Sequence, residues 1–261
     1  MTMGPGGGAL LRVLKLGTSD DLTAAIPEED RAHRVTQRFL GDATGLPVEV
    51  ISRVIWPGPK LPGLIDQWLD RYEPDLVLLV VNPYWMTFES VPLRLQRRLG
   101  WAGKAAGDMG TRVAGVPWLA YNPVFRAGRR FALKTIGGDV HFEPAEVVAV
   151  VEQCARRVLR REGIGLVFRG PRNALTYHND AAGRARGERR RRETHIALAR
   201  LAMELHAGYV GSDSPALAFD DANAFRGDFV HTTTREHRER GLIEGRALLD
   251  AWRELAGGSP G

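Results

Sequence analysis

A serine, an aspartate and a histidine that could act together in nucleophilic catalysis lie near opposite ends of this sequence. Ser19 follows a short apolar run, and Asp228 and His231 stand three positions apart near the C-terminus. A serine hydroxyl becomes an effective nucleophile when a histidine removes its proton and a carboxylate holds that histidine in one tautomer. A spacing of three lets two polar side chains emerge on one side of a turn. The sequence therefore predicts a relay in which Asp228 orients His231 and His231 activates Ser19.

Each of these residues also has a purely structural interpretation. Serine and aspartate after a strand or loop often cap the helix that follows, and a histidine at a helix start is often a satisfied structural residue. If Asp228 only caps the final helix, another aspartate must orient the histidine. The next candidates are Asp213, Asp220 and Asp221. His237, six positions after His231, is expected to face outward and to take no part.

Two further residues could stabilise the negative charge that acyl transfer develops. Asn82 ends an apolar run and precedes Pro83, which disfavours helical backbone for Asn82 and holds it extended. Its side-chain amide could then donate to the oxyanion of a tetrahedral intermediate. The backbone N–H of Gly58 could do the same, because the absence of a Cβ permits close approach. Asn-Pro and Pro-Gly-Pro are also ordinary turn signals, which is the alternative interpretation of both residues.

A parallel sheet must position these residues, because short apolar runs alternate with helical periods along the chain. Runs bounded by Gly, Pro or Asp predict strands at 10–16, 48–51, 76–81, 164–168 and 208–210. Apolar residues at spacings of three and four predict helices at 28–39, 61–72, 144–161, 193–206 and 235–255. This alternation indicates βαβ units, hence helices on both faces of the sheet. In such sheets ligands bind beyond the carboxyl ends of the strands.

Residues 83–143 do not fit this alternation, because they are far longer than an ordinary strand-to-helix loop. We expect an inserted element that forms a lid or wall over Ser19 and decides the substrate. Its first large side chains, Trp85, Met86 and Phe88, follow Asn82 directly and are predicted to line a pocket for the acyl part of a substrate. The alternative is that these aromatic and apolar side chains only give the insertion a small core of its own.

The length and composition predict one domain. The chain has 261 residues, of which 44% are hydrophobic, with Gly/Pro-rich segments at 1–8 and 256–261 that predict loose tails. No window approaches the ~18 apolar residues of a membrane helix, and the N-terminal apolar stretch is interrupted by Arg12 and Lys15. We expect a cytoplasmic protein that neither spans a membrane nor is secreted. The single Cys154 excludes an intrachain disulfide and a cysteine metal cluster, and is expected to be a small buried hydrophobe.

The positive charge does not by itself indicate a nucleic-acid partner. The formal net charge is +5, and arginine supplies almost all of the basic side chains. The dense run Arg189–Arg192, with Arg184 and Arg186 ahead of it, has no interleaved aromatic residues on which bases could stack. We interpret it as a solvated face or a mobile loop. The sequence leaves the oligomeric state open.

The order of these residues resembles that of the SGNH hydrolase superfamily, the GDSL-type lipases and esterases. Ser19 matches the nucleophile of the first conserved block, Gly58 the glycine of the second, Asn82 the asparagine of the third, and Asp228 with His231 the final pair. Glu73-Pro74-Asp75-Leu76-Val77 is similar to the segment that precedes the third block. The sequence departs from the family where Thr18 replaces the Asp of the first block, and where Val80 and Pro83 replace the Gly and the final Asp of the third block. Gly63 is an alternative match for the second block.

The resemblance implies a three-layer α/β/α fold with a flavodoxin-like parallel sheet of about five strands and a helical insertion after the third. It implies a serine hydrolase that acts on an ester, thioester or similar acyl substrate through an acyl-enzyme on Ser19. The oxyanion hole would consist of Ser19, Gly58 and Asn82. No metal or organic cofactor would be required. Acyl transfer with the same triad remains a second possibility, and a catalytically silent binding protein that keeps this fold remains a third.

Overall fold

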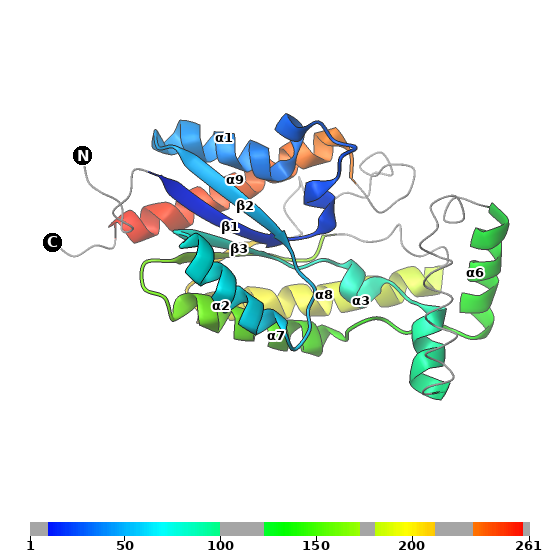
Figure 1. Ribbon diagram of the computed structural model, residues 1–261. Helices are drawn as coiled ribbons and strands as arrows, with labels where there is room; N and C mark the ends of the chain where they lie inside the picture. The colour runs from blue at the N-terminus through cyan, green and yellow to red at the C-terminus, as the bar shows by residue number, and fades with distance from the viewer. Residues whose placement is uncertain (1–9, 100–122, 173–180, 212–231, 258–261) are drawn as a thin grey trace.

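The computed structural model describes residues 10–99, 123–172, 181–211 and 232–257 (Figure 1). Its strands are β1 (Leu11–Gly17), β2 (Val48–Val54), β3 (Leu76–Val80), β4 (Gly165–Arg169) and β5 (Gly208–Val210). Its longer helices are α1 (Ala32–Thr44), α2 (Leu61–Tyr72), α6 (Pro123–Thr135), α7 (Pro144–Leu159), α8 (Ala181–Glu204) and α9 (Thr234–Gly257). Three short helices are η1 (Ser19–Leu22), η2 (Glu28–Asp30) and α3 (Tyr84–Thr87).

The five strands form one sheet in which every neighbouring pair is parallel. The strand order is β2-β1-β3-β4-β5, which is the flavodoxin-like order of doubly wound folds. The chain reverses its direction of travel across the sheet at β1 and β3, so the carboxyl ends of these two strands form the switch point at which such folds bind ligands. The predicted α/β architecture is confirmed.

Helices cover both faces of the sheet, because successive strand residues point to opposite sides (Figure 1). On one face, Leu11 and Val13 of β1 pack in a core cluster that includes Leu248 of α9. On the other face, Leu14 and Leu16 belong to the larger cluster that includes residues of α2, α7 and α8. Lys15 continues the first set, so the strand directs a lysine onto the face that α9 covers.

Several helix boundaries differ from the prediction for identifiable reasons. The helix expected at 28–39 begins at Ala32, because 28–30 form η2 and Arg31 is extended, and it continues to Thr44. Gly45 then ends it in the left-handed region at φ 70°. The helix expected at 193–206 begins at Ala181 and includes the arginine run. Helix α9 continues to Gly257, so the tail predicted at 256–261 is wrong for its first two residues.

The arginine run is less exposed than expected, because carboxylates of α8 itself and of the segment after α3 bind it. Arg186 donates two hydrogen bonds to the buried Glu89, each of 2.8 Å. Arg190 forms an ion pair with the same carboxylate at 3.4 Å. Arg191 is buried and is held by Glu188 at 2.6 Å. The interpretation of this run as a solvated face is therefore wrong for Arg190 and Arg191. Arg186 and Arg190 attach α8 to the segment after α3, whereas Arg191 is held within α8.

The described part of the insertion is helical, as predicted, and comprises α3, a helix over 91–99 and α6. Helix α6 stands apart from the helices that cover the sheet (Figure 1). The side chains of Trp85 and Met86 are 2% and 0% exposed and belong to the main core cluster. The prediction that they line a substrate pocket is wrong, because they fill the core of the domain. Phe88 is half-buried and stacks on Tyr84 with ring centroids 4.5 Å apart.

Candidate functional site

Three of the predicted site residues follow the carboxyl ends of neighbouring strands. Ser19 comes after β1, Gly58 after β2 and Asn82 after β3, and β1 pairs with both of the other strands. Parallel strands end at the same edge of a sheet, so these residues share the edge at which this topology places ligands.

Ser19 is exposed at the first position of η1, and within the described residues no group forms a hydrogen bond with its hydroxyl. The extended Thr18, at φ −114° and ψ 162°, turns the chain out of the strand. A Cβ on Gly17 would lie 2.8 Å from Asp21 Oδ2, so glycine is needed for the chain to fold back. As the first residue of η1, Ser19 also has no carbonyl of the same helix to which its N–H could donate.

The side chain of Asn82 is held in one orientation. Its Oδ1 accepts a hydrogen bond of 3.0 Å from the backbone N–H of Tyr84, and its carbonyl accepts one of 3.2 Å from Trp85. The oxygen is thus used to cap α3, while no described group accepts a hydrogen bond from Nδ2. The half-buried amide therefore has a donor group that could bind a ligand at the sheet edge.

Gly58 lies in open surroundings, because a Cβ placed on it would meet nothing within 4 Å. No contact with another described residue requires glycine there, whereas an approaching ligand could use the space. Gly63, the alternative match, lies in the first turn of α2.

Asp228 and His231 lie outside the described residues, as do Asp213, Asp220 and Asp221. Thr232, which follows His231 in the chain, is described and is fully buried. Its backbone N–H donates to Asp20 Oδ1 at 3.2 Å, and its hydroxyl donates to Asp20 Oδ2 at 2.7 Å. The segment that leads into α9 is therefore fixed to the turn that carries Ser19.

His237 is fully buried, and the expectation that it faces outward is wrong. Its Nδ1 lies 3.3 Å from the backbone nitrogen of Ala32 and 2.9 Å from Arg240 Nη2, both of them donors. Its Nε2 lies 3.6 Å from Asp20 Oδ1. Because both ring nitrogens face protein groups in the interior, His237 packs α9 against α1 and does not meet a substrate.

A buried network of charged side chains lies directly behind Ser19, and the sequence analysis missed it. Its basic members are Lys15, Arg169, Arg172 and Arg240, and its acidic members are Asp20, Asp21, Glu236 and Glu244. Lys15 Nζ lies 3.0 Å from Asp21 and 2.6 Å from Glu244. The Arg240 guanidinium lies 2.9 Å from Asp20 and 3.0 Å from Asp21. Equal numbers of both signs compensate one another, as buried charges require.

The network keeps its carboxylates ionised in spite of their burial. Burial raises the pKa of Asp20, but Arg240 and His237 outweigh it and hold the pKa below its ordinary value. Burial likewise raises the pKa of Asp21, and Lys15, Arg240 and Arg169 together hold it below the ordinary value. The opposing carboxylates raise the pKa of Arg240, although its burial lowers it. The two aspartates in the turn that follows Ser19 are therefore ionised and are held in place by their basic partners.

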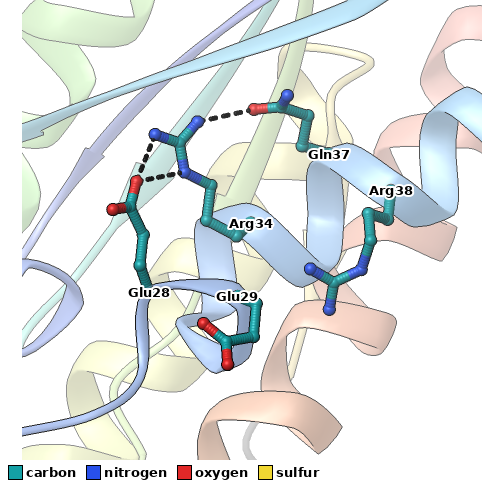
Figure 2. A pocket seen from close by; sticks show the side chains of 5 residues that line it. All are labelled: Glu28, Glu29, Arg34, Gln37 and Arg38. Carbon is teal, nitrogen blue, oxygen red and sulfur yellow. Dashed lines mark hydrogen bonds and ion pairs between the residues drawn. The ribbon is translucent and has the colours of Figure 1, made fainter.

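Other parts of the described structure offer no better site. No group of three or more His, Cys, Asp or Glu residues within it could hold a metal ion. An open surface pocket of about 400 Å³ is lined by Glu28, Glu29, Arg34, Gln37 and Arg38 (Figure 2). Arg34 already donates to Glu28 at 2.6 Å and to Gln37 at 3.1 Å, so three of the five lining side chains are bonded to one another. None of the helices that the structure describes is long and apolar enough to cross a membrane.

Comparison with solved structures identifies the fold. The chain is similar to Est24, a carbohydrate acetylesterase from Sinorhizobium meliloti, at 12% identity and a TM-score of 0.55, over 92% of this chain and 99% of that one. It is similar to an inhibitor-bound aryl esterase from M. smegmatis at 14% identity and a TM-score of 0.51, over 92% and 99%. A GDSL-like protein from Parabacteroides merdae matches at 11% identity and a TM-score of 0.52, over 95% of both chains.

No protein-family model and no curated protein matches the sequence. The structural likeness nevertheless extends over nearly the whole of both chains in each comparison, with the same parallel sheet between two layers of helices. The chain therefore shares the fold of these structures, and this is the α/β/α fold with a five-stranded parallel sheet that the sequence predicted.

Proposed function

We propose that this protein is a serine hydrolase that cleaves an ester, thioester or similar acyl substrate through an acyl-enzyme on Ser19. The observation that carries the proposal is the pair of hydrogen bonds between Asp20 and Thr232, which are 212 positions apart. Asp20 is the chain neighbour of Ser19, and Thr232 is the chain neighbour of His231. These bonds support a relay in which His231 removes the Ser19 proton and Asp228 orients His231.

The reaction then follows from the groups at the sheet edge. Ser19 Oγ forms a bond to the carbonyl carbon of the substrate as its proton passes to His231. The carbonyl oxygen becomes an oxyanion, which would accept hydrogen bonds from the backbone N–H groups of Ser19 and Gly58 and from Asn82 Nδ2. Collapse breaks the bond to the leaving alcohol or thiol, which takes the proton from His231. Water then attacks the acyl-enzyme by the same steps and releases the carboxylic acid.

Hydrolysis is favoured over acyl transfer because Ser19 is exposed, which gives water access to the acyl-enzyme. The relatives also point in this direction, since those compared above include a carbohydrate acetylesterase and an aryl esterase. The half-buried ring of Phe88 remains our candidate for contact with the acyl part, and the insertion at 83–143 remains our candidate lid.

A serine-directed fluorophosphonate tests the proposal. Wild-type protein should be labelled, Ser19→Ala should not, and Ser52→Ala is a control that should be labelled like the wild type. With p-nitrophenyl esters and acyl thioesters of graded chain length, Ser19→Ala and His231→Ala should each lower kcat by several orders of magnitude. The double variant should be little worse, because the residues act as one unit. Folded wild type that neither labels nor turns over any ester would support the silent binding protein instead.

Two further variants test the assigned roles. Asp228→Asn should fold and be severely impaired, because the wrong histidine tautomer would be held. Near wild-type turnover would move the carboxylate to Asp213, Asp220 or Asp221. Asn82→Ala should lower kcat by about 10²- to 10³-fold with little change in KM, because an oxyanion donor acts in the transition state. A change confined to KM would make Asn82 a substrate-binding residue.

A further inference from the structure

The buried carboxylate of Asp20 joins three parts of the described structure. Its Oδ1 accepts from the Thr232 N–H at 3.2 Å. Its Oδ2 accepts from the Thr232 hydroxyl at 2.7 Å and from Arg240 Nη1 at 2.9 Å. One side chain therefore connects the turn of Ser19, the residue that leads into α9 and the interior of α9 itself.

These hydrogen bonds connect the chain neighbours of the two proposed catalytic residues, so they can affect catalytic geometry as well as stability. The Thr232 N–H belongs to the peptide unit that joins residues 231 and 232, so a bond to it restrains the backbone at the point where the proposed base leaves the chain. Asp20 is joined by one peptide bond to the proposed nucleophile. A carboxylate accepts backbone N–H bonds strongly, and Arg240 holds this carboxylate in one orientation.

We propose that Asp20 is a positioning residue that sets the distance between the nucleophile turn and the segment carrying the catalytic base. This inference rests on the proposed function. Asp20 does not touch the substrate, because its side chain is buried and its oxygens are occupied by Thr232 and Arg240. It acts through geometry, and a misplacement of reacting groups by about 1 Å can cost about 10²-fold in rate.

The structure supplies a matched control for each partner. Asp30 also has a buried side chain that holds α9, through bonds of 2.7 Å and 2.9 Å to Arg238, but it lies in η2 and does not contact Thr232. Thr36 is fully buried like Thr232, and its hydroxyl donates to the α9 carbonyl of Gly241 at 2.9 Å. Asp30→Ala and Thr36→Val therefore weaken the docking of α9 without changing the Asp20–Thr232 hydrogen bonds, which we call the clamp.

The test is steady-state hydrolysis of p-nitrophenyl acetate together with thermal unfolding of each variant. Asp20→Ala should lower kcat by about 10²-fold and leave KM within about twofold, because only the alignment of reacting groups is lost. Thr232→Val should lower kcat by about tenfold, since one of two bonds remains. Asp30→Ala and Thr36→Val should lose stability but keep kcat within about twofold. Equal loss of kcat in Asp20→Ala and Asp30→Ala would overturn the inference.

Asp20→Asn separates alignment from folding. The amide oxygen can still accept from the Thr232 N–H, whereas the buried Arg240 loses a compensating charge. We expect this variant to unfold at a lower temperature than Asp30→Ala and yet to retain a higher kcat than Asp20→Ala. If kcat instead follows unfolding temperature across all variants, Asp20 is only structural. Should Asp20→Ala fail to fold, Thr232→Val is compared with Thr36→Val: a lower kcat only in Thr232→Val supports the inference, and equal kcat in the two variants overturns it.

Failure of the proposed function would be recognised separately. The proposed function is wrong if the folded wild-type protein is neither labelled by fluorophosphonate nor able to hydrolyse the ester. It is also wrong if the Ser19→Ala variant retains turnover. In that case the Asp20–Thr232 hydrogen bond is tested directly, by measuring hydrogen exchange of the Thr232 amide in the wild type, Asp20→Ala and Asp30→Ala. Loss of protection only in Asp20→Ala supports the clamp, and equal protection in all three proteins overturns it.

Discussion

Replacing Lys15 with methionine should destabilise the protein strongly at neutral pH. The side chain is fully buried, and its ammonium lies 3.0 Å from Asp21 and 2.6 Å from Glu244. Methionine has a similar volume, so the change removes the charge and little of the packing. Removing one partner of a buried ionic group typically costs about 3 to 5 kcal/mol, because the remaining charge is left uncompensated. In a domain of this size that corresponds to a fall in Tm on the order of 10 °C.

The pH dependence of this loss gives a second, independent measurement. Lys15 holds the pKa of Asp21 below its ordinary value of 3.8, so the stability that this carboxylate contributes is present above that pH and is lost as the pH falls. Without the lysine the pKa of Asp21 rises, and the folded variant takes up a proton more readily than the unfolded chain. The difference in free energy of unfolding between wild type and variant should therefore shrink between pH 7 and pH 5.

Chemical denaturation at the two pH values measures both effects, and Lys15→Met/Glu244→Gln serves as the companion variant. This double change keeps the network balanced, so it should lose less than the sum of the single losses, by about 1 to 3 kcal/mol. A loss below about 1 kcal/mol for Lys15→Met, or strict additivity with Glu244→Gln, would refute the view that these charges compensate one another.

Two further predictions concern other buried groups. Burial, followed by the charge of Lys15, lowers the pKa of His33 to about 4 from 6.5, so its contribution to stability is present above 6.5 and is lost as the pH falls toward 4. The free energy of unfolding should therefore fall less between pH 7 and pH 5 in His33→Gln than in the wild type, and equal slopes would contradict this. Burial raises the pKa of Cys154 to about 12, so the native thiol should react with a disulfide reagent at least about a hundredfold more slowly than in denaturant. Rapid reaction of the native protein would show that Cys154 is accessible.

The sequence was sufficient to predict the sheet and the three strand ends that carry the proposed site residues, because buried parallel strands are short apolar runs with sharp boundaries. It was not sufficient to predict that Lys15 is buried in an ionic network, because this lysine interrupts such a run and has a partner 229 positions away. The sequence did contain one signal of a buried charge, namely a single lysine within an apolar run, at a position that strand periodicity assigns to a buried face. The function of Trp85 was misassigned for a related reason, since the same apolar pattern describes a core residue and a pocket residue. The start of α8 was missed because its glycines and arginines form no apolar stripe. Glu89, which binds two of these arginines, also lies far away in the chain.

Helix α9 supplies Glu236, Arg240 and Glu244 to charges that are carried by β1 and the turn after it. On the ribosome, Lys15, Asp20 and Asp21 are made first, and their partners are made more than two hundred residues later. Until α9 has emerged, Lys15 has Asp21 as a partner but lacks Glu244, and Asp20 lacks Arg240. Burial of β1 and the turn after it would then leave charge uncompensated in the interior, which costs several kcal/mol per ion. We therefore expect the start of the sheet to complete its burial only after α9 has been synthesised. Translation that stops before α9 would yield a chain that is recognised as unfolded rather than a shortened but compact domain.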